Sequence, residues 1–500
     1  MKQFVFKNYL LMAFIGILAT SCSKSNDDEV TKADPKLLSF GFYEANNEGV
    51  IVQDYEVSAV TGTAITIALP KEIDRSELVA QFTASPNTTV TVNGEIQQSG
   101  NSVQDFSTPV DYIVTEGQTN ARYTITVVNA ADYVWTKLST YSSDETNNMI
   151  MKVNPVDGIP YVLYKGNREE SEDEKAFMVK FEDNSWSFVG SDQGVSDGQV
   201  GSDLDLAFDK DGKTYAAYLD YTANVSQAVS VKQLQNSAWS LVGSKGFTNE
   251  KISYMGMGIN PANQQPMVFN TIDGRSGTLP RRALGVSNFD GSTWSINNEI
   301  PGRSTSTYAS LQVSKTVGDA LYLGIFNNGG SPQTYSIYKY ENNTWETIAE
   351  QMIEPGAGNL NLRDFDLDVD RSGNIYIIAA DDATTSGTYN PRVKKYDAET
   401  KSWSQVGNVL PFDLGSARYL SLAVSPTGVP FVLYRNEQMY PEVVSLDSET
   451  KDWTAPKVLE ASQLGVADVY LDFSPDGVGY AAFVNEAGAV SLYKYDVPAK

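Results

Sequence analysis

Seven tryptophans recur at nearly even spacing along most of the chain, and this period constrains the fold more than any other feature. The chain has 500 residues, and neighbouring tryptophans stand 50 to 58 residues apart. They are Trp135, Trp186, Trp239, Trp294, Trp345, Trp403 and Trp453. A fixed period of this length indicates a repeat architecture, in which each repeat is one structural unit packed against its neighbours.

Each repeat contains four short apolar runs with the character of β-strands. After Trp186 the first three runs are 204–208, 214–218 and 228–231, and the fourth holds Trp239. A tight turn such as Asp211-Gly212 separates the first two runs, because glycine adopts the positive φ that such hairpins need. Four antiparallel strands in about 50 residues are typical of one blade of a β-propeller.

The two ends of the repeat region predict how the ring closes. The region opens with the fourth-strand motif at Trp135 and ends with a third strand at 490–495. We therefore expect the strand of Trp135 to complete the last blade, so that residues 133–500 form a seven-bladed propeller without free sheet edges. We also expect each tryptophan to pack between blades, because burying an aromatic ring of this size contributes several kcal/mol, at ~25 cal/mol/Å².

The repeats resemble those of the kelch-like propellers of secreted bacterial proteins. The shared motifs are Trp186-Ser-Phe-Val-Gly190 and, further along the repeat, Leu206-Ala-Phe-Asp-Lys-Asp-Gly-Lys-Thr-Tyr215. This resemblance concerns architecture, since propellers host many functions. Galactose oxidase-like enzymes have the same shape but need copper-binding histidines, and the chain has no histidine. The Asp-box of sialidases is absent as well.

Residues 34–131 contain no tryptophan and predict a separate β-sandwich, so the whole chain is expected to be all-β. Strand-like runs recur at 37–43, 64–69, 78–82, 88–92, 110–115 and 123–128. About seven short alternating strands in such a length are typical of a sandwich. The motifs 90–94, 105–112 and 122–127 resemble Ig-like or cadherin-like domains that follow the lipid anchor in surface lipoproteins of glycan-foraging bacteria. That resemblance implies a spacer that lifts the next domain off the membrane.

Residues 1–22 predict a lipoprotein signal peptide. Lys2 and Lys7 precede a short apolar stretch at 9–18, which is typical of a secretory signal and too short for a good membrane span. Cys22 is the only cysteine in the chain. Its surroundings resemble a bacterial lipobox, although Ala19 stands where leucine is usual. The resemblance implies lipidation of Cys22 and attachment to the membrane through that lipid; the alternative is an ordinary signal with a chance cysteine.

Residues 23–33 predict an acidic tether behind this cysteine. Its Asp27-Asp28-Glu29 run resembles the signal that sends some Gram-negative lipoproteins to the outer face of the outer membrane. A solvated linker is the simpler interpretation of the same residues.

Charge and composition exclude several classes of function. The formal net charge of −25 repels phosphate backbones, so we expect no nucleic-acid binding. The absence of histidine removes the commonest general base and every Ser–His or Cys–His nucleophile pair.

A candidate binding face lies where the channel should open among the long loops, because the loops of several blades converge there. The opposite rim carries only tight turns. The first polar residue of each inner strand should ring this mouth, and tyrosine rings there could stack on sugars while acids and amides form hydrogen bonds. These residues are Asn148, Asp203, Tyr254, Tyr308, Asp364, Tyr419 and Asp468, with Arg418 beside them. The outer loops offer Tyr221, Arg275, Arg281, Arg282, Tyr389, Arg392 and Tyr440 as further candidates.

The inner strands also carry a dense set of acids. Their alternation predicts that apolar residues pack between blades while the polar set faces the channel. The run Asp366-x-Asp368-x-Asp370 has calcium-like spacing. Hydration of these carboxylates is the preferred interpretation, with Ca²⁺ as the alternative; we predict no cofactor and no dedicated metal site.

The sequence thus favours a non-enzymatic outer-membrane surface lipoprotein whose propeller binds a glycan or an envelope protein. One alternative is a carboxylate-dependent glycan-cleaving enzyme, which needs two acids about 5–10 Å apart. Another is a scaffold subunit of an outer-membrane uptake complex.

Overall fold

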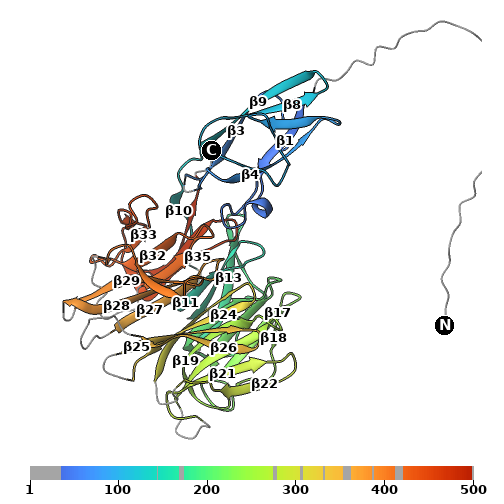
Figure 1. Ribbon diagram of the computed structural model, residues 1–500. Helices are drawn as coiled ribbons and strands as arrows, with labels where there is room; N and C mark the ends of the chain where they lie inside the picture. Colours follow the sequence, from blue (N-terminus) through green and yellow to red (C-terminus); the bar gives the residue numbers. More distant parts are fainter. Residues whose placement is uncertain are drawn as a thin grey trace, which may run out of the picture.

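The computed structural model describes residues 35–71, 73–142, 145–167, 174–273, 279–303, 308–329, 333–352, 362–385, 388–410 and 420–497 (Figure 1). The predicted signal peptide, Cys22 and the acidic tether lie outside these residues. Within them the secondary structure is β-strand apart from one short 3-10 helix, η1 (Glu44–Asn46). The all-β prediction is confirmed.

Two sheets that share one core form the first domain, which we define by its strands between residues 37 and 129. One sheet has the order β2-β1-β4-β7 and the other β3-β9-β8-β5-β6, with β3 parallel to β9. The rings of Phe40 on the first sheet and Tyr112 on the second lie 5.1 Å apart, so the two sheets face each other. The strands are β1 (Leu37–Phe42), β2 (Tyr55–Val57), β3 (Ala64–Leu69), β4 (Leu78–Ala84), β5 (Thr89–Val92), β6 (Glu95–Ile96), β7 (Val103–Gln104), β8 (Val110–Glu116) and β9 (Thr119–Asn129).

Seven four-stranded antiparallel sheets follow, and we number them as blades 1 to 7. The strands of each blade are named from the innermost to the outermost. Blade 1 is β11 (Glu145–Val153), β12 (Pro160–Asn167), β13 (Lys175–Glu182) and β14 (Ser185–Phe188). Blade 2 is β15 (Val200–Phe208), β16 (Thr214–Asp220), β17 (Ala228–Gln235) and β18 (Ala238–Leu241). Blade 3 is β19 (Ile252–Asn260), β20 (Gln265–Ile272), β21 (Leu284–Phe289) and β22 (Trp294–Asn298).

The remaining blades have the same order. Blade 4 is β23 (Ala309–Val317), β24 (Ala320–Asn327), β25 (Thr334–Glu341) and β26 (Thr344–Met352). Blade 5 is β27 (Leu362–Val369), β28 (Ile375–Thr385), β29 (Thr388–Asp397) and β30 (Ser402–Val406). Blade 6 is β31 (Leu420–Val424), β32 (Pro430–Arg435), β33 (Pro441–Ser445) and β34 (Lys457–Val458). Blade 7 is β35 (Leu464–Phe473), β36 (Gly479–Asn485), β37 (Val490–Asp496) and β10 (Val134–Tyr141).

The ring closes through β10, the strand that carries Trp135. It pairs antiparallel with β37, from Val134 opposite Asp496 to Tyr141 opposite Val490. Each innermost strand contacts that of the next blade, and β35 contacts β11. The strand pairing therefore shows the predicted seven-bladed propeller, in which β10 completes the last blade.

Tryptophan and glycine interlock at three of the blade junctions. The indole Nε1 of Trp239 in blade 2 donates to the Val189 carbonyl of blade 1 at 2.9 Å. A Cβ on Gly190 would lie only 2.7 Å from that indole nitrogen, so only glycine leaves room for the ring. Trp294 lies in the same way on Gly243 and donates to the Val242 carbonyl, whereas Trp453 lies on Gly407 and donates to the Asn408 carbonyl that follows it. Packing of tryptophan between blades is thus confirmed at these junctions, and it explains the glycine of the Trp-x-x-Val-Gly motif.

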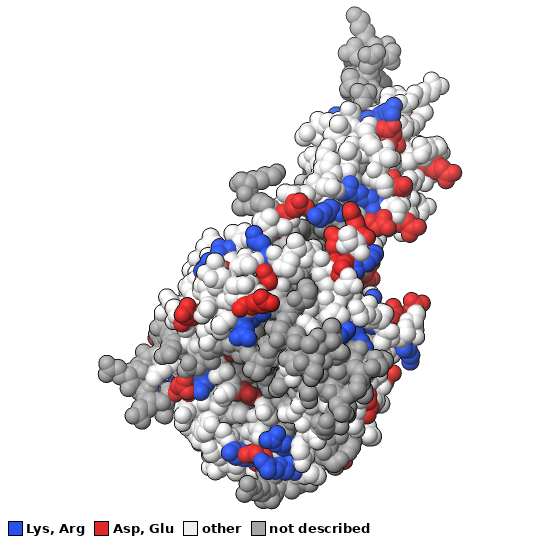
Figure 2. Space-filling view, turned by 90° about the vertical axis from the view of Figure 1, so that its left-hand side faces the viewer, with Lys and Arg blue, Asp and Glu red and all other residues white. Residues whose placement is uncertain are grey.

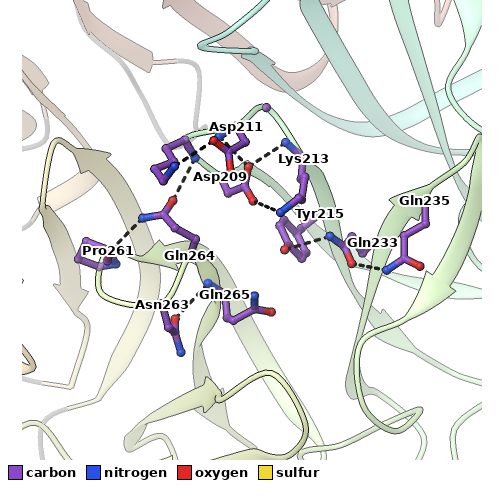
Figure 3. Close-up of polar contacts among 12 residues, drawn as sticks. Asp209, Asp211, Lys213, Tyr215, Gln233, Gln235, Pro261, Asn263, Gln264 and Gln265 are labelled. Carbon is purple, nitrogen blue, oxygen red and sulfur yellow. Dashed lines mark hydrogen bonds and ion pairs between the residues drawn. The ribbon is translucent and has the colours of Figure 1, made fainter. Parts of the chain in front are cut away.

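The tight turns between the first two strands of the blades are capped by polar side chains. In blade 2, the Asp209 Oδ1 accepts from the amides of Asp211 and Lys213, both at 2.9 Å (Figure 3). The amide of Lys210 donates to the Gln264 Oε1 of blade 3 at 3.0 Å. These contacts stabilise the turn and link it to the neighbouring blade, so the tight-turn rim is held in place.

The first domain docks onto this tight-turn rim, above blades 5 and 7 (Figure 1). Arg371, in the turn of blade 5, forms an ion pair with Glu44 of η1 at 2.6 Å and donates to the Pro475 carbonyl of blade 7 at 2.6 Å. A Cβ on Gly477 would lie 3.1 Å from Val52, which shows how closely the surfaces approach. Figure 2 shows acidic and basic side chains gathered where the two domains meet.

Candidate functional site

The predicted mouth residues that the structure describes lie at one end of the channel. Asn148, Asp203, Tyr254 and Asp468 lie on β11, β15, β19 and β35, and Tyr308 directly precedes β23. The innermost strands run from this end to the tight-turn rim, so these residues lie at the rim opposite the first domain. Arg418 and Tyr419 lie outside the described residues, as does the side chain of Asp364.

Two of the predicted acids are brought next to other predicted residues. The Asp203 Oδ2 accepts from the Met255 amide at 3.0 Å, which places Asp203 beside Tyr254 on the next blade. The Asp468 Oδ2 accepts from the Met149 amide at 2.8 Å, beside Asn148. Each carboxylate therefore has one oxygen bound to the neighbouring blade. These two acids line the mouth and also join adjacent blades there.

Tyr308 is the most accessible of the described mouth residues. Its exposed fraction is 42%, and its carbonyl accepts from the Asn328 amide at 2.9 Å. A Cβ on Gly329 would lie 2.7 Å from the tyrosine ring, so the ring lies flat against a glycine. Such a supported, exposed aromatic ring can stack on a flat ligand with little loss of conformational entropy.

Arg282 lies next to this tyrosine and has an unusual backbone. Its φ is +64°, although it is not a glycine, and its carbonyl accepts from the Ala309 amide at 3.1 Å. Its own amide donates to the Ile272 carbonyl at 2.6 Å. Left-handed backbone at a bulky residue costs about 1–2 kcal/mol and gathers at functional sites. Arg282 is therefore an outer-loop candidate whose backbone is bonded to the residue that follows Tyr308.

The outer-loop tyrosines differ in how much of each ring is exposed to a ligand. Tyr221 is 38% exposed, and its hydroxyl accepts from the Gln227 side chain at 2.6 Å. Tyr389 is only 7% exposed, so it belongs to the core and presents no face to a ligand. Tyr440 is half-buried, and Arg275 lies outside the described residues.

The innermost strands confirm one half of the predicted alternation and contradict the other: the apolar face packs between blades as predicted, but the polar face turns to the next blade instead of the channel. The apolar face packs against the preceding blade: the ring of Phe208 on β15 lies 5.2 Å from that of Tyr161 on β12. The polar face turns to the next blade, where the Asp205 Oδ2 accepts from the Met257 amide at 2.6 Å. Because blades radiate from the axis, both faces of a strand meet a neighbouring blade, and the channel is lined by strand edges.

The predicted hydration of the inner acids is therefore replaced by bonds to protein. An innermost strand is the edge of its sheet, so half of its amides have no partner within the sheet. Carboxylates of the preceding blade accept from these amides: Asp366 from Leu422 at 2.8 Å, Asp368 from Val424 at 2.7 Å and Asp472 from Val153 at 2.8 Å. The acids thus join blades 5 and 6, and blades 7 and 1.

Two lysines that the sequence analysis missed neutralise these acids. The Lys315 Nζ of blade 4 lies 3.2 Å from the Asp368 Oδ1 of blade 5 and 3.2 Å from the Asp472 Oδ1 of blade 7, so this side chain reaches across the channel. The Lys152 Nζ lies 2.8 Å from the Asp205 Oδ1. Burial acts to lower the pKa of Lys315, but the two carboxylates outweigh it and raise that pKa. Each lysine is the only lysine of its strand, and its partners lie on other blades. The spacing of residues along the sequence therefore does not predict these ion pairs.

The calcium-like run does not converge on a point. Asp366 and Asp368 bind two different amides of β31, while the Asp370 Oδ1 accepts from the Ser372 amide in its own turn at 2.9 Å. Burial raises the pKa of Asp366 to about 7 and also raises that of Asp368. In the described part of the chain, no group of three or more acids or cysteines is arranged to hold a metal ion.

Among the described residues, no helix is long and apolar enough to cross a membrane. No curated protein matches the chain. The chain is similar to a PL25 ulvan lyase structure, at 13% identity and a TM-score of 0.47, covering 72% of this chain and 96% of that one. It is similar to an α-L-arabinanase of Penicillium chrysogenum, at 10% identity and a TM-score of 0.44, covering 72% and 99%.

A third similar structure is the GH93 α-L-arabinofuranosidase of Fusarium graminearum, at 11% identity and a TM-score of 0.40, covering 71% of this chain and 98% of that one. Likenesses this distant do not bear on the substrate or activity of this chain. Within the first domain, residues 43–127 match the family model described as SGBP, N-terminal, and this segment is therefore similar to the N-terminal part of SGBP proteins.

Proposed function

We propose that this protein is a non-enzymatic surface glycan-binding protein of the outer membrane, held by a lipid on Cys22. The observation that carries the proposal is the match of residues 43–127 to the N-terminal segment of SGBP, the surface glycan-binding proteins. In this proposal residues 1–22 are the signal peptide, 23–33 the tether, 34–131 an Ig-like spacer and 133–500 a kelch-like propeller. An envelope protein as the ligand remains the alternative partner.

The docking of the first domain supports the long-loop rim as the binding face. Glu44 and Val52 contact the turns of blades 5 and 7, so the first domain covers part of the tight-turn rim. The rim of Tyr254 and Tyr308 faces the other way, toward whatever approaches from outside. A spacer placed between the anchor and the tight turns therefore presents the mouth to a glycan.

The polar contacts of the channel argue against the glycan-cleaving alternative. A carboxylate-dependent enzyme needs one acid that donates a proton and one that acts as a base or nucleophile. Three of the described inner acids, Asp205, Asp368 and Asp472, are bound to amides and lysines, which favours a role in joining the blades.

A glycan array probed with a soluble form spanning residues 35–500 tests the proposal. We expect saturable binding of at least one glycan without release of product. Replacing Tyr254 and Tyr308 by alanine should weaken that binding at least tenfold, about 1.4 kcal/mol, without lowering the melting temperature. Tyr221→Ala is the matched control, because Tyr221 is 38% exposed on a separate loop.

Two results would contradict the proposal. Release of shorter sugars in proportion to enzyme concentration would favour the enzyme instead. If the double variant binds with unchanged affinity while Tyr221→Ala loses binding, the site lies on the outer loops and not at the mouth.

A further inference from the structure

A cleft of about 240 Å³ opens on the side of the ring, between blades 6 and 7. Its walls come from β10, the residue before it and β37 on one side, and from β32, β33, β34 and the segment before β34 on the other. Tyr133, Trp135 and Tyr495 line the first wall, and Phe431, Thr454 and Lys457 line the second. The cleft lies near the start of β10, away from the mouth residues on the innermost strands.

The cleft lies where the fourth strand of blade 6 is unusually short. Its β34 has only two residues, and Trp453 is held by an isolated bridge to Leu446. Lys457 stands four residues after Trp453, at the position that Gly190 has after Trp186. The next tryptophan around the ring, Trp135, therefore has no glycine to lie on.

Trp135 differs in its hydrogen bonding from the interlocked tryptophans. The indoles of Trp239, Trp294 and Trp453 each donate to a carbonyl of the preceding blade. Within the part of the chain that the structure describes, no residue accepts a hydrogen bond from the Trp135 indole. A half-buried indole donor at a cleft wall is thus left for water or a ligand.

An aromatic wall surrounds this donor. The ring of Tyr495 lies 5.1 Å from that of Trp135, 5.3 Å from that of Tyr133 and 5.1 Å from that of Phe431. The electron-rich faces of such rings attract the weakly positive C–H groups of a sugar ring. On the opposite side the Thr454 Oγ1 accepts from the Ser445 amide at 3.1 Å, which fixes the position of that hydroxyl.

A single cation completes the cleft. Lys457 is exposed and, among the described residues, forms no ion pair. Lys457 supplies a local positive charge beside the aromatic rings, so an anionic group in the cleft can pair with its ammonium even though the chain as a whole has a net charge of −25. An anionic group on a flat, ring-shaped ligand matches the aromatic wall, the indole donor and the ammonium together.

We propose that this cleft is a second carbohydrate site, which takes one hexuronate residue of an acidic polysaccharide. The sugar ring stacks on the Trp135 and Tyr133 wall, its carboxylate pairs with the Lys457 ammonium, and a hydroxyl oxygen accepts from the Trp135 indole. The site goes beyond the proposed function at the mouth, because it uses other residues and can bind whether or not the mouth does.

Calorimetric titration of residues 35–500 with tetragalacturonate and with a β-1,4-linked tetraglucuronate tests the site, and neutral galactotetraose serves as the uncharged probe. We expect at least one acidic probe to bind at least tenfold more tightly than the neutral one, and less tightly as salt rises. Lys457→Met should remove this preference. Trp135→Phe keeps an aromatic ring and loses the donor, so it should weaken binding several-fold.

Controls separate this site from the mouth and from misfolding. Lys451→Met removes an exposed lysine of the same blade and should leave binding unchanged, and melting temperatures identify any variant that is destabilised. Binding that survives Tyr254→Ala with Tyr308→Ala but not Lys457→Met supports the cleft, even if the mouth proposal fails. Absence of binding of both acidic probes overturns the cleft, as does unchanged affinity in Lys457→Met, while the mouth proposal stands.

Discussion

At the scale of single residues, the acids at the centre of the ring illustrate how one side chain can take an unexpected role. Asp205, Asp366 and Asp368 accept from amides that the edge strands leave without a sheet partner. The sequence showed that these positions are acidic and alternate, but not that a backbone amide about 50 residues away would meet them. Alternation gives the side of a strand that a residue occupies; the partner depends on the angle between blades.

Asp366 gives a prediction on pH. Burial raises its pKa to about 7, whereas an unfolded aspartate titrates near ~3.9. The folded state therefore binds this proton more tightly, and its contribution to stability is lost as the pH rises from about 4 to about 7. In Asp366→Asn this contribution is absent, so the fall in unfolding free energy from pH 5 to pH 8 should shrink by on the order of 2 kcal/mol.

Urea unfolding of parent and variant at both pH values measures this effect. The variant should be less stable at either pH, because an amide –NH₂ replaces one acceptor of the Leu367 and Leu422 amides. The pH difference, rather than the stability itself, decides the matter. An unchanged pH difference would show that Asp366 is not the titrating group.

At the scale of elements, the blades are alike in topology and unlike in the way they are joined. Tryptophan lies on glycine where the Val-Gly of the motif is present, as with Trp239 on Gly190. The period of tryptophan predicted the number of blades and the closing strand, because both follow from local patterns. The shortness of β34 was not predicted, because blade 6 has its tryptophan, Trp453, like the other blades. Only the strand pairing in the structure shows that Trp453 forms an isolated bridge and that β34 has two residues.

Two truncated forms test the closing strand with a matched control. Residues 132–500 keep β10, whereas residues 142–500 lack it and leave the edge of β37 open; both lack the first domain. We expect the longer form to be monomeric with cooperative unfolding, and the shorter form to aggregate or to melt well below it, because an unpaired edge strand invites pairing between molecules. Light scattering and calorimetry measure both, and equal melting temperatures would show that β10 is dispensable.

At the scale of the whole molecule, the first domain does more than precede the propeller. Only four residues, 130–133, separate the last strand of the first domain, β9, from the first strand of the propeller, β10. The structure adds a docking contact that no local pattern could indicate, since Glu44 and Arg371 are 327 residues apart along the chain. A contact between such distant segments depends on both folds being complete.

Reversing this charge pair tests the docking. Glu44→Arg should loosen the first domain by placing two arginines side by side, and adding Arg371→Glu should restore the docked state. The exposed pair contributes at most about 1 kcal/mol, so we expect a broader range of orientations rather than unfolding. Residues 35–500 contain no cysteine, so spin labels at Ile96→Cys and Leu241→Cys report the distance between domains. The same distance distribution in all forms would mean that the linker alone sets the geometry.

The closing pair of β10 with β37 also determines how the molecule carries mechanical load. β10 begins at Val134, beside the first domain, and runs away from it along β37 to Tyr141. Tension between an anchor on the N-terminal side and a ligand at the opposite rim would pull β10 lengthwise along its partner. The hydrogen bonds of an antiparallel pair lie across the strands, so such a pull strains all of them at once instead of opening them one by one. Under such tension the pair of β10 and β37, which closes the ring, would be pulled in the direction in which an antiparallel pair resists separation best.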